Sequence, residues 1–302
     1  MNSNLTTLKL NELNGSLFDW ELETRQLQSG ILKGVVDFRN TKELSIMSTS
    51  FSHRIEQMGN APKDYYTFSI TADTISSFKW RGYDIKPNNV MMFPLSGELN
   101  AITQADFNVY LISVRTDFLE DLIAINNLNK IKDRLDKFEL FEADPNTLAL
   151  IRHYAQGFLH APNVTYLKYQ IPILLLKSIA YSKNITPNNK NTVKDYSINS
   201  FLDYFKSTDF ANVNIKNFCS ETRIAQRTLE YAFIEKYNMT PKAYVNNVRL
   251  NQAFKEIIIN RYKNVLIKDI AYDCDFNHMG QFSKDFYKLF QIKPTQLFQN
   301  KV

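Results

Sequence analysis

The sequence predicts an α+β protein with a β-rich amino-terminal part and an all-helical carboxyl-terminal part. Residues 31–115 hold short runs of β-branched and aromatic residues between turn-like breaks, which is typical of strands. Residues 116–182 instead place apolar residues at helical spacing, and the last third is helical in short pieces. A chain of 302 residues has room for two domains. We therefore expect domains at 1–181 and 197–302, joined by a linker at 182–196.

The β-rich region is predicted from five runs, several of which alternate apolar with polar residues. Short strands in such close succession favour a small sandwich or barrel. The runs are LKGVVDF, LSIMSTSF, YYTFSITA, VMMFPLSG and FNVYLISV. The helices predicted after them either complete this domain or form a dimer interface. In the last of these helices, Pro172 should produce a kink or lie in the first turn.

The segment SKNITPNNKNTVKDYS, residues 182–197, separates the two parts. It is polar, contains Pro187 and four asparagines, and shows no apolar periodicity. Such a composition is typical of an interdomain linker.

The composition indicates a protein of the reducing cytoplasm. Two cysteines, Cys219 and Cys274, are too few for a disulfide framework. The amino terminus lacks an apolar stretch long enough for a signal peptide. The most apolar run, IPILLL at 171–176, is far too short to span a membrane. We therefore expect a cytoplasmic protein without a membrane partner.

Charge is distributed unevenly along the chain, whose formal net charge is +5. Residues 197–302 carry 15 Lys and Arg against 10 Asp and Glu, whereas the preceding residues carry 21 of each sign. The basic excess in the last third favours an anionic partner, most simply nucleic acid. An excess of this size is also common on ordinary protein surfaces.

The last third contains a repeated pattern. IKNFCSETRI begins at Ile215, and IKDIAYDCDF begins at Ile267. In both copies, two apolar residues and then a small residue, Cys219 or Ala271, share one helical face. A break follows in each copy and predicts a tight turn to the next helix.

The similarity continues beyond this turn. LEYAFIEKYNMTP (229–241) matches FSKDFYKLFQIKP (282–294), with apolar residues at i, i+4 and i+8 that form one buried stripe. Each copy therefore predicts a helix-turn-helix unit, whose second helix enters the major groove of DNA. Residues 240–259 suit a helix that joins the units, so that they fill successive major grooves about 34 Å apart. The alternative is a helical bundle whose similar pieces merely pack together.

The last third of the chain resembles the DNA-binding domain of AraC/XylS-type transcription regulators. The resemblance is carried by QRTLEYAFIEKYNMTPKAYVNNVRL (226–250) and by residues 267–298, which include HMGQFSKDFYKLF. Within the family, these residues are most similar to the branch that contains the ethanolamine-utilisation regulators and the XylS-like activators. The resemblance implies a β-rich, cupin-like regulatory domain that senses a small molecule, with dimerisation through the helices that follow it. It also implies activation more often than repression, contact with RNA polymerase, and no cofactor.

The resemblance places the DNA contacts mainly on the second helix of each unit. Arg227 can make a bidentate contact with guanine, Gln281 can do so with adenine, and Glu230 can accept a hydrogen bond from cytosine. Met279 offers only an apolar contact and Gly280 offers no side chain, so the second unit should read fewer bases than the first. The expected base readers are Gln226, Arg227, Glu230, Tyr231, Met279, Gly280, Gln281 and Lys284, and the expected phosphate contacts are Thr228, Ser283, Lys288 and Asn214.

Two positions depart from the family pattern. Ala225 stands where the family usually has a serine that caps the first recognition helix, and a missing cap costs about 1 kcal/mol. Thr222 or Arg223 could compensate for it. Asp275 stands where the second turn usually has glycine, but Asp tolerates left-handed backbone geometry better than most residues, so we expect this turn to survive.

The sequence gives no indication of catalysis or of a metal site. The four histidines, at 53, 153, 160 and 278, form no metal-ligand pair, and no hydrolase, phosphate-loop or dinucleotide motif is present. The cysteines occupy predicted packing positions. In the β-rich region, aromatic residues could line an effector pocket or fill the core. The effector-binding candidates are Phe51, His53, Trp80, Tyr83 and Phe93.

The sequence therefore predicts a regulator of transcription that binds double-stranded DNA and has a sensing amino-terminal domain. A small-molecule effector, RNA polymerase and a second copy of the chain are its expected partners. Two alternatives stay open. The first is a regulator controlled by a protein partner or by its own expression level, and the second is an enzyme with an accessory helical domain.

Overall fold

The computed structural model describes residues 6–8, 15–17, 20–72, 78–81, 83–93, 95, 98–185, 193–263 and 265–299. The chain forms two compact units. The β-rich unit comprises residues 1–24 and 32–188, and the helical unit comprises residues 25–31 and 189–302. Of the expected linker at 182–196, residues 186–192 lie outside the described part, and a helix begins within it at Val193.

The larger sheet of the β-rich unit has seven antiparallel strands, and all five strand-like runs of the sequence lie in it. Its centre is strand β12, where Ile112 pairs with Ile46 on one side and with Phe68 on the other. In order across the sheet, the strands are β1 (Thr6–Leu8), β4 (Gly34–Asn40), β5 (Leu44–Phe51), β12 (Phe107–Arg115), β7 (Tyr65–Thr71), β10 (Asn89–Phe93) and β13 (Leu140–Glu142).

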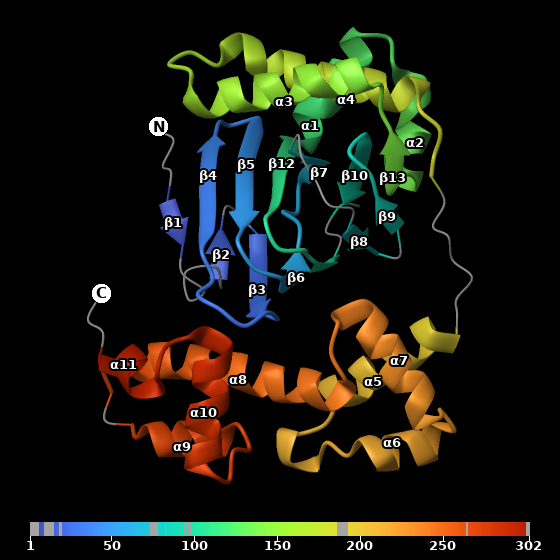
Figure 1. Cartoon of the computed structure of the whole chain (residues 1–302). Coiled ribbons are helices and arrows are strands. Elements are labelled where there is room, and N and C mark those ends of the chain that lie inside the picture. Colours follow the sequence, from blue (N-terminus) through green and yellow to red (C-terminus); the bar gives the residue numbers. More distant parts are fainter. Residues whose placement is uncertain are drawn as a thin grey trace. The chain divides into compact units, whose positions relative to one another are not determined.

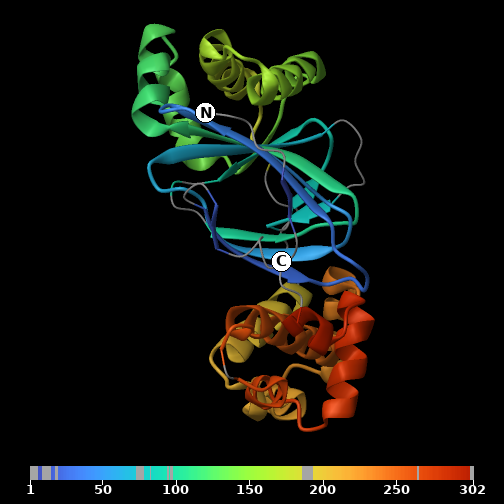
Figure 2. The same ribbon diagram turned by 90° about the vertical axis from the view of Figure 1, so that its left-hand side faces the viewer.

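A second sheet of six strands lies face to face with the first, so that the unit is a two-layered sandwich (Figure 2). Its order is β2 (Gly15–Leu17), β3 (Trp20–Gln26), β6 (Ile55–Asn60), β11 (Glu98–Ile102), β8 (Phe78–Trp80) and β9 (Tyr83–Ile85). Most of these strands are short or polar, as in IEQMGN of β6, which is why their sequences gave no strand signal.

Helices cover the outer face of the seven-stranded sheet (Figure 1). They are α1 (Thr116–Ile125), the 3-10 turn η2 (Asn129–Ile131), α2 (Lys132–Lys137), α3 (Pro145–His160) and α4 (Thr165–Tyr181). Ile151 of α3 and Leu175 of α4 are fully buried in one core with Ile46 and Phe68 of the sheet. Pro172 is buried inside α4, beyond its first turn.

The helical unit is built around one long helix, α8 (Pro241–Asn260) (Figure 1). On one side of α8 lie α5 (Val193–Lys206), the 3-10 turn η3 (Phe210–Asn212), α6 (Ile215–Thr222) and α7 (Gln226–Tyr237). On the other side lie α9 (Ile267–Asp273), α10 (Met279–Phe290) and α11 (Pro294–Gln299). Pro241 occupies the first turn of α8, and Thr240 caps it by accepting a hydrogen bond from the Ala243 amide (3.2 Å).

The repeated sequence pattern forms two helix-turn-helix units, α6–α7 and α9–α10. Five pairs of residues that occupy matching positions in the two copies are buried in both copies. The matching buried pairs are Phe218 with Ile270, Ile224 with Phe276, Leu229 with Phe282, Phe233 with Phe286, and Tyr237 with Phe290. The duplicated pattern was therefore a correct prediction of a duplicated structure.

Each helix-turn-helix unit has its own aromatic core, and α8 contributes to both. In the first, the ring of Tyr244 lies 4.6 Å from that of Tyr237 and 5.4 Å from that of Phe233, between ring centroids. In the second, the ring of Phe254 lies 4.6 Å from that of Phe290. Because Tyr244 and Phe254 stand on one helix, α8 connects the two cores.

Among the helices of the described residues, none is both long enough and apolar enough to pass through a membrane.

Candidate nucleic-acid interface

The turn before the first recognition helix uses a left-handed residue. Arg223, with φ 58°, ends α6, and α7 begins at Gln226. Ala225 makes no side-chain cap, as expected, and the Thr222 hydroxyl donates to the Phe218 carbonyl (2.7 Å) of its own helix. Thr222 therefore does not replace the missing cap.

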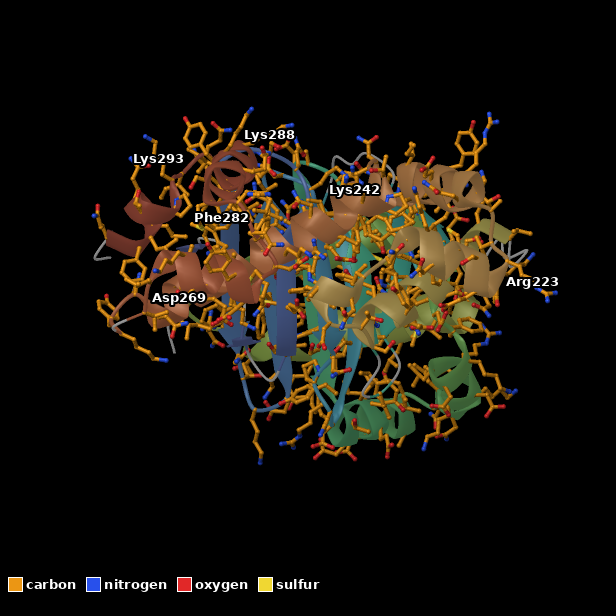
Figure 3. The ribbon with its side chains drawn as sticks, turned by 90° about the horizontal axis from the view of Figure 1, so that it is seen from below. Arg223, Lys242, Asp269, Phe282, Lys288 and Lys293 are labelled. Atoms are coloured by element: carbon orange, nitrogen blue, oxygen red, sulfur yellow. The ribbon has the colours of Figure 1, made fainter. Side chains whose placement is uncertain are left out.

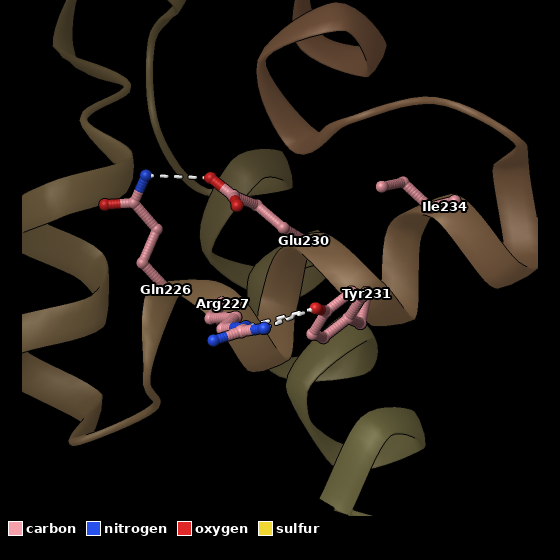
Figure 4. A pocket seen from close by; sticks show the side chains of 5 residues that line it. All are labelled: Gln226, Arg227, Glu230, Tyr231 and Ile234. Atoms are coloured by element: carbon pink, nitrogen blue, oxygen red, sulfur yellow. Dashed lines mark hydrogen bonds between the residues drawn. The ribbon is translucent and has the colours of Figure 1, made fainter.

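The outward face of α7 presents four of the predicted base-reading residues together. The Arg227 guanidinium donates two hydrogen bonds to the Tyr231 hydroxyl, from Nη2 (2.8 Å) and Nε (3.1 Å). The Gln226 amide donates to the Glu230 carboxylate (2.9 Å). Figure 4 shows the two pairs side by side on the helix. These contacts pair the polar ends of the four side chains on the protein surface.

These four residues and Ile234 line a surface hollow of about 400 Å³ (Figure 4). Tyr231 is 51% exposed and Ile234 is 46% exposed. An exposed tyrosine ring, an exposed aliphatic side chain and an arginine provide both apolar and hydrogen-bonding surface for base edges.

The second recognition helix, α10, presents a different set of side chains. Gln281, Ser283, Lys284 and Lys288 are exposed, whereas Met279 is half-buried. Figure 3 shows Lys288 pointing outward and Phe282 in the interior, which matches the burial of Phe282. A methyl group built on Gly280 would have no neighbour within 4 Å, so this position is open space.

The remaining predicted phosphate contacts lie on the first unit. Asn214 is exposed and caps α6, because its side-chain oxygen accepts a hydrogen bond from the Asn217 amide (3.1 Å). Thr228 is half-buried on α7. Amide groups at the start of a helix such as α6 attract phosphate. The roles of all twelve predicted DNA contacts stay predictions.

The second departure from the family pattern, Asp275, adopts the left-handed conformation, with φ 63°. The Asp275 amide donates to the Tyr272 carbonyl (2.8 Å), and the Phe276 amide donates to the Ala271 carbonyl (2.9 Å). This is a Schellman motif, which normally favours glycine at the left-handed position. The turn forms with aspartate, as predicted.

Three of the five effector-binding candidates lie together in the β-rich unit. The Trp80 ring lies 5.3 Å from the Phe93 ring and 6.0 Å from the Tyr83 ring, and all three residues are buried. Phe51 is buried on β5, and His53 is half-buried beside Ser52, whose hydroxyl lies 2.8 Å from its Nδ1. The aromatic residues therefore fill core in this structure.

Tyr83 and Trp80 also carry polar atoms inside this cluster. The Tyr83 hydroxyl donates to the Glu139 carboxylate (3.0 Å), and burial together with this bond raises the pKa of Tyr83 to about 12. The indole N–H of Trp80 is buried and has no hydrogen-bond partner among the described residues.

The cysteines are poor nucleophiles. Burial raises the pKa of the Cys274 thiol to about 12, and it also raises the pKa of Cys219. A thiol with a raised pKa holds little of the reactive thiolate at neutral pH. Within the described ranges, no group of three or more His, Cys, Asp or Glu side chains could hold a metal ion.

Three features of this surface were missed in the sequence. Asp285 accepts a hydrogen bond from the Gln281 amide (2.8 Å), and its spacing of four residues could have revealed it. Ile234 is exposed on the polar face of α7. Arg249 of α8 pairs with Asp275 (2.8 Å), and nothing in the local sequence signals this contact.

Comparison with known proteins supports this account of the helical unit. A family model described as a helix-turn-helix domain matches residues 218–300. The HTH-type transcriptional activator RhaS of Escherichia coli O1:K1 is 26% identical over 132 residues, which cover 44% of each chain. RhaS of Mannheimia succiniciproducens is 37% identical over 71 residues, which cover 24% of this chain and 25% of that protein. The similarity thus spans less than half the length of these relatives.

Two solved structures align over most of the chain at low identity. The AraC-like transcriptional activator CuxR is 12% identical with a TM-score of 0.42, over 89% of this chain and 100% of that chain. ToxT from Vibrio cholerae O395, bound to (E)-4-(8-methylnaphthalen-1-yl)but-3-enoic acid, is 15% identical with a TM-score of 0.32, over 93% and 98% of the two chains.

Three observations agree that the last third of the chain forms helix-turn-helix units. They are the match to the helix-turn-helix domain, the similarity to RhaS, and the two units that the repeated residues form in the structure. The chain thus contains a helix-turn-helix domain, and over part of its length it is similar to the RhaS transcriptional activators.

Proposed function

We propose that this protein is a sequence-specific transcription regulator that binds double-stranded DNA through α7 and α10. The observation that carries the proposal is the duplicated helix-turn-helix unit, in which each recognition helix buries its apolar stripe and exposes polar side chains. The basic excess of residues 197–302 provides attraction to phosphates. The name of the RhaS relatives favours an activator.

The length of α8 supports binding to two successive major grooves. Its 20 residues span about 30 Å, since each residue of an α-helix rises about 1.5 Å. Successive major grooves on one side of DNA lie about 34 Å apart. A helix of this length therefore suits two recognition helices in neighbouring grooves.

The test of DNA binding uses duplexes that the full chain selects from a random-sequence library. Affinity should fall steeply as salt rises, because bound cations are released from the phosphates. Arg227→Ala should weaken binding to the selected duplex by about 1–3 kcal/mol and relax the preference at one base pair. Arg261→Ala removes an arginine outside both recognition helices and serves as the control. Unchanged base preference in Arg227→Ala would contradict the role of Arg227.

The β-rich unit is proposed to sense a small molecule. The supporting observation is the aromatic cluster around Trp80, whose buried indole N–H has no hydrogen-bond partner among the described residues. A thermal-shift screen of the full chain against metabolites should give at least one stabilising compound, and Trp80→Phe should reduce that shift. If no compound stabilises the chain, control by a protein partner or by expression level becomes the better account.

The proposal also includes a cytoplasmic location, contact with RNA polymerase, and a homodimer formed through helices of the β-rich unit. In vitro transcription from a promoter that contains the selected duplex measures activation, and light scattering of the full chain measures the oligomeric state. Turnover of a substrate by the purified chain would favour the enzyme alternative.

A further inference from the structure

We propose that Arg249 and Asp275 form a bridge that sets the position of the two helix-turn-helix units relative to each other, and hence the spacing of DNA half-sites that the protein accepts. Arg249 is therefore a positioning residue, since it is distinct from all the predicted DNA contacts. This inference rests on the proposed binding of DNA by both units.

The guanidinium of Arg249 reaches both units from α8. Its Nη2 lies 2.8 Å from Oδ2 of Asp275, which stands in the turn of the second unit. The same Nη2 donates to the carbonyl of Phe210, in the 3-10 turn η3 that leads into α6 of the first unit. The guanidinium carbon also lies 5.8 Å from the centre of the Phe210 ring. One side chain thus connects the entry to the first unit with the turn of the second.

The environment makes these contacts stronger than an ordinary surface ion pair. The Arg249 side chain is 18% exposed and the Asp275 side chain is 24% exposed. Partial burial reduces screening by solvent, and a hydrogen bond between charged groups is stronger than one between neutral groups. Fully exposed pairs, by comparison, contribute little to stability.

The backbone conformation at Asp275 indicates that the carboxylate is needed for its contact with Arg249. With φ 63°, this residue holds the left-handed conformation that glycine adopts with the least strain. Aspartate is less suited to this backbone than glycine, yet its carboxylate is the group that reaches Arg249. The side chain therefore supplies a contact that glycine could not make.

The experiment uses a duplex with two half-sites, selected from a random-sequence library by the wild-type full chain, and derivatives with one or two base pairs inserted between the half-sites. Two inserted base pairs rotate one half-site by about 70°, since one turn holds about 10.5 base pairs. Wild-type affinity should fall about tenfold or more with this insertion. In Asp275→Asn and Asp275→Gly, the loss should shrink to about threefold or less.

Comparisons among variants isolate the bridge. Because glycine favours the left-handed conformation of this turn, Asp275→Gly should fold. It therefore shows the effect of losing the carboxylate alone. Asp273→Asn removes an exposed carboxylate two residues away, and it should keep the wild-type spacing profile while matching the change in net charge. Arg249→Gln combined with Asp275→Asn should be no more tolerant of insertions than the more tolerant single variant. A duplex with one half-site should bind all variants alike.

The outcomes distinguish the two proposals. If the wild-type chain selects no sequence or accepts every insertion, the proposed binding by two units fails. If the wild-type chain is sensitive to insertions and Asp275→Asn and Asp275→Gly keep that sensitivity, the bridge alone is overturned.

Discussion

The two helix-turn-helix units share their cores but differ in their recognition surfaces. When α7 and α10 are aligned from their first residues, Arg227 corresponds to Gly280 and Tyr231 corresponds to Lys284. The first helix has an ordered arginine–tyrosine pair, whereas the second has open space and a lysine. Packing therefore constrains the buried positions of both copies, while the exposed positions have diverged. We therefore expect the second unit to read fewer bases than the first.

The largest expected effect tests the shared cores. Phe233→Ala in the first unit and Phe286→Ala in the second should each lower the free energy of unfolding by about 3–5 kcal/mol, because both side chains are fully buried among other rings. Urea denaturation followed by circular dichroism measures both. Phe298, which is half-buried at the edge of the unit, is the control: Phe298→Ala should cost clearly less. A large difference between Phe233→Ala and Phe286→Ala would show that the two cores are not equivalent.

The next effect tests the ordered pair of the first unit. Tyr231→Phe removes the hydroxyl that accepts two hydrogen bonds from Arg227 and should weaken binding to the selected duplex by about 0.5–1.5 kcal/mol. Fluorescence anisotropy measures the affinity. Tyr287→Phe removes an exposed hydroxyl from α10 and is the matched control. If the two variants bind equally well, the pair does not prepare Arg227 for DNA.

A substitution that should tighten DNA binding tests the open space at Gly280 in the second unit. Gly280→Arg places a long cation into open space on α10 and should tighten binding by about 1 kcal/mol, with a salt slope steeper by about 0.9 for one added phosphate contact. Gly280→Ala is the control, because both alanine and arginine have a higher helix propensity than glycine, but only arginine adds a charge. The expectation is wrong if the arginine and alanine variants show the same salt dependence.

A final comparison concerns the ends of the recognition helices. Asn238 after α7 and Gln291 after α10 both hold left-handed backbone, with φ 56° and φ 55°. Gln291→Gly should raise the free energy of unfolding by about 1 kcal/mol, because glutamine is strained there. Asn238→Gly should gain less, since asparagine tolerates this conformation. Thermal unfolding of both variants makes the comparison, and an equal gain would refute the difference.

The sequence predicted the helical unit more completely than the β-rich unit for a physical reason. Apolar residues that recur twice at helical spacing, as at Leu229 and Phe282, are a signal that survives in a single sequence. Strands such as β8 and β9 have only three residues each, too few to show alternation. The same difference applies to contacts between side chains. Contacts one helical turn apart can be predicted from the spacing of the residues in the sequence. The contact between Arg249 and Asp275 cannot, because it depends on tertiary folding.

The connecting helix α8 also limits how this protein can change its target during evolution. Inserting one residue into an α-helix lengthens it by about 1.5 Å and turns everything beyond it by about 100°. A single insertion in α8 would therefore point α10 away from the groove, although the added length is small. Only steps of about seven residues, two full turns, restore the facing, and they add about 10.5 Å. The distance between the two DNA half-sites that the protein accepts can thus change only in coarse steps. Side chains at the helix ends must make any finer adjustment of this distance.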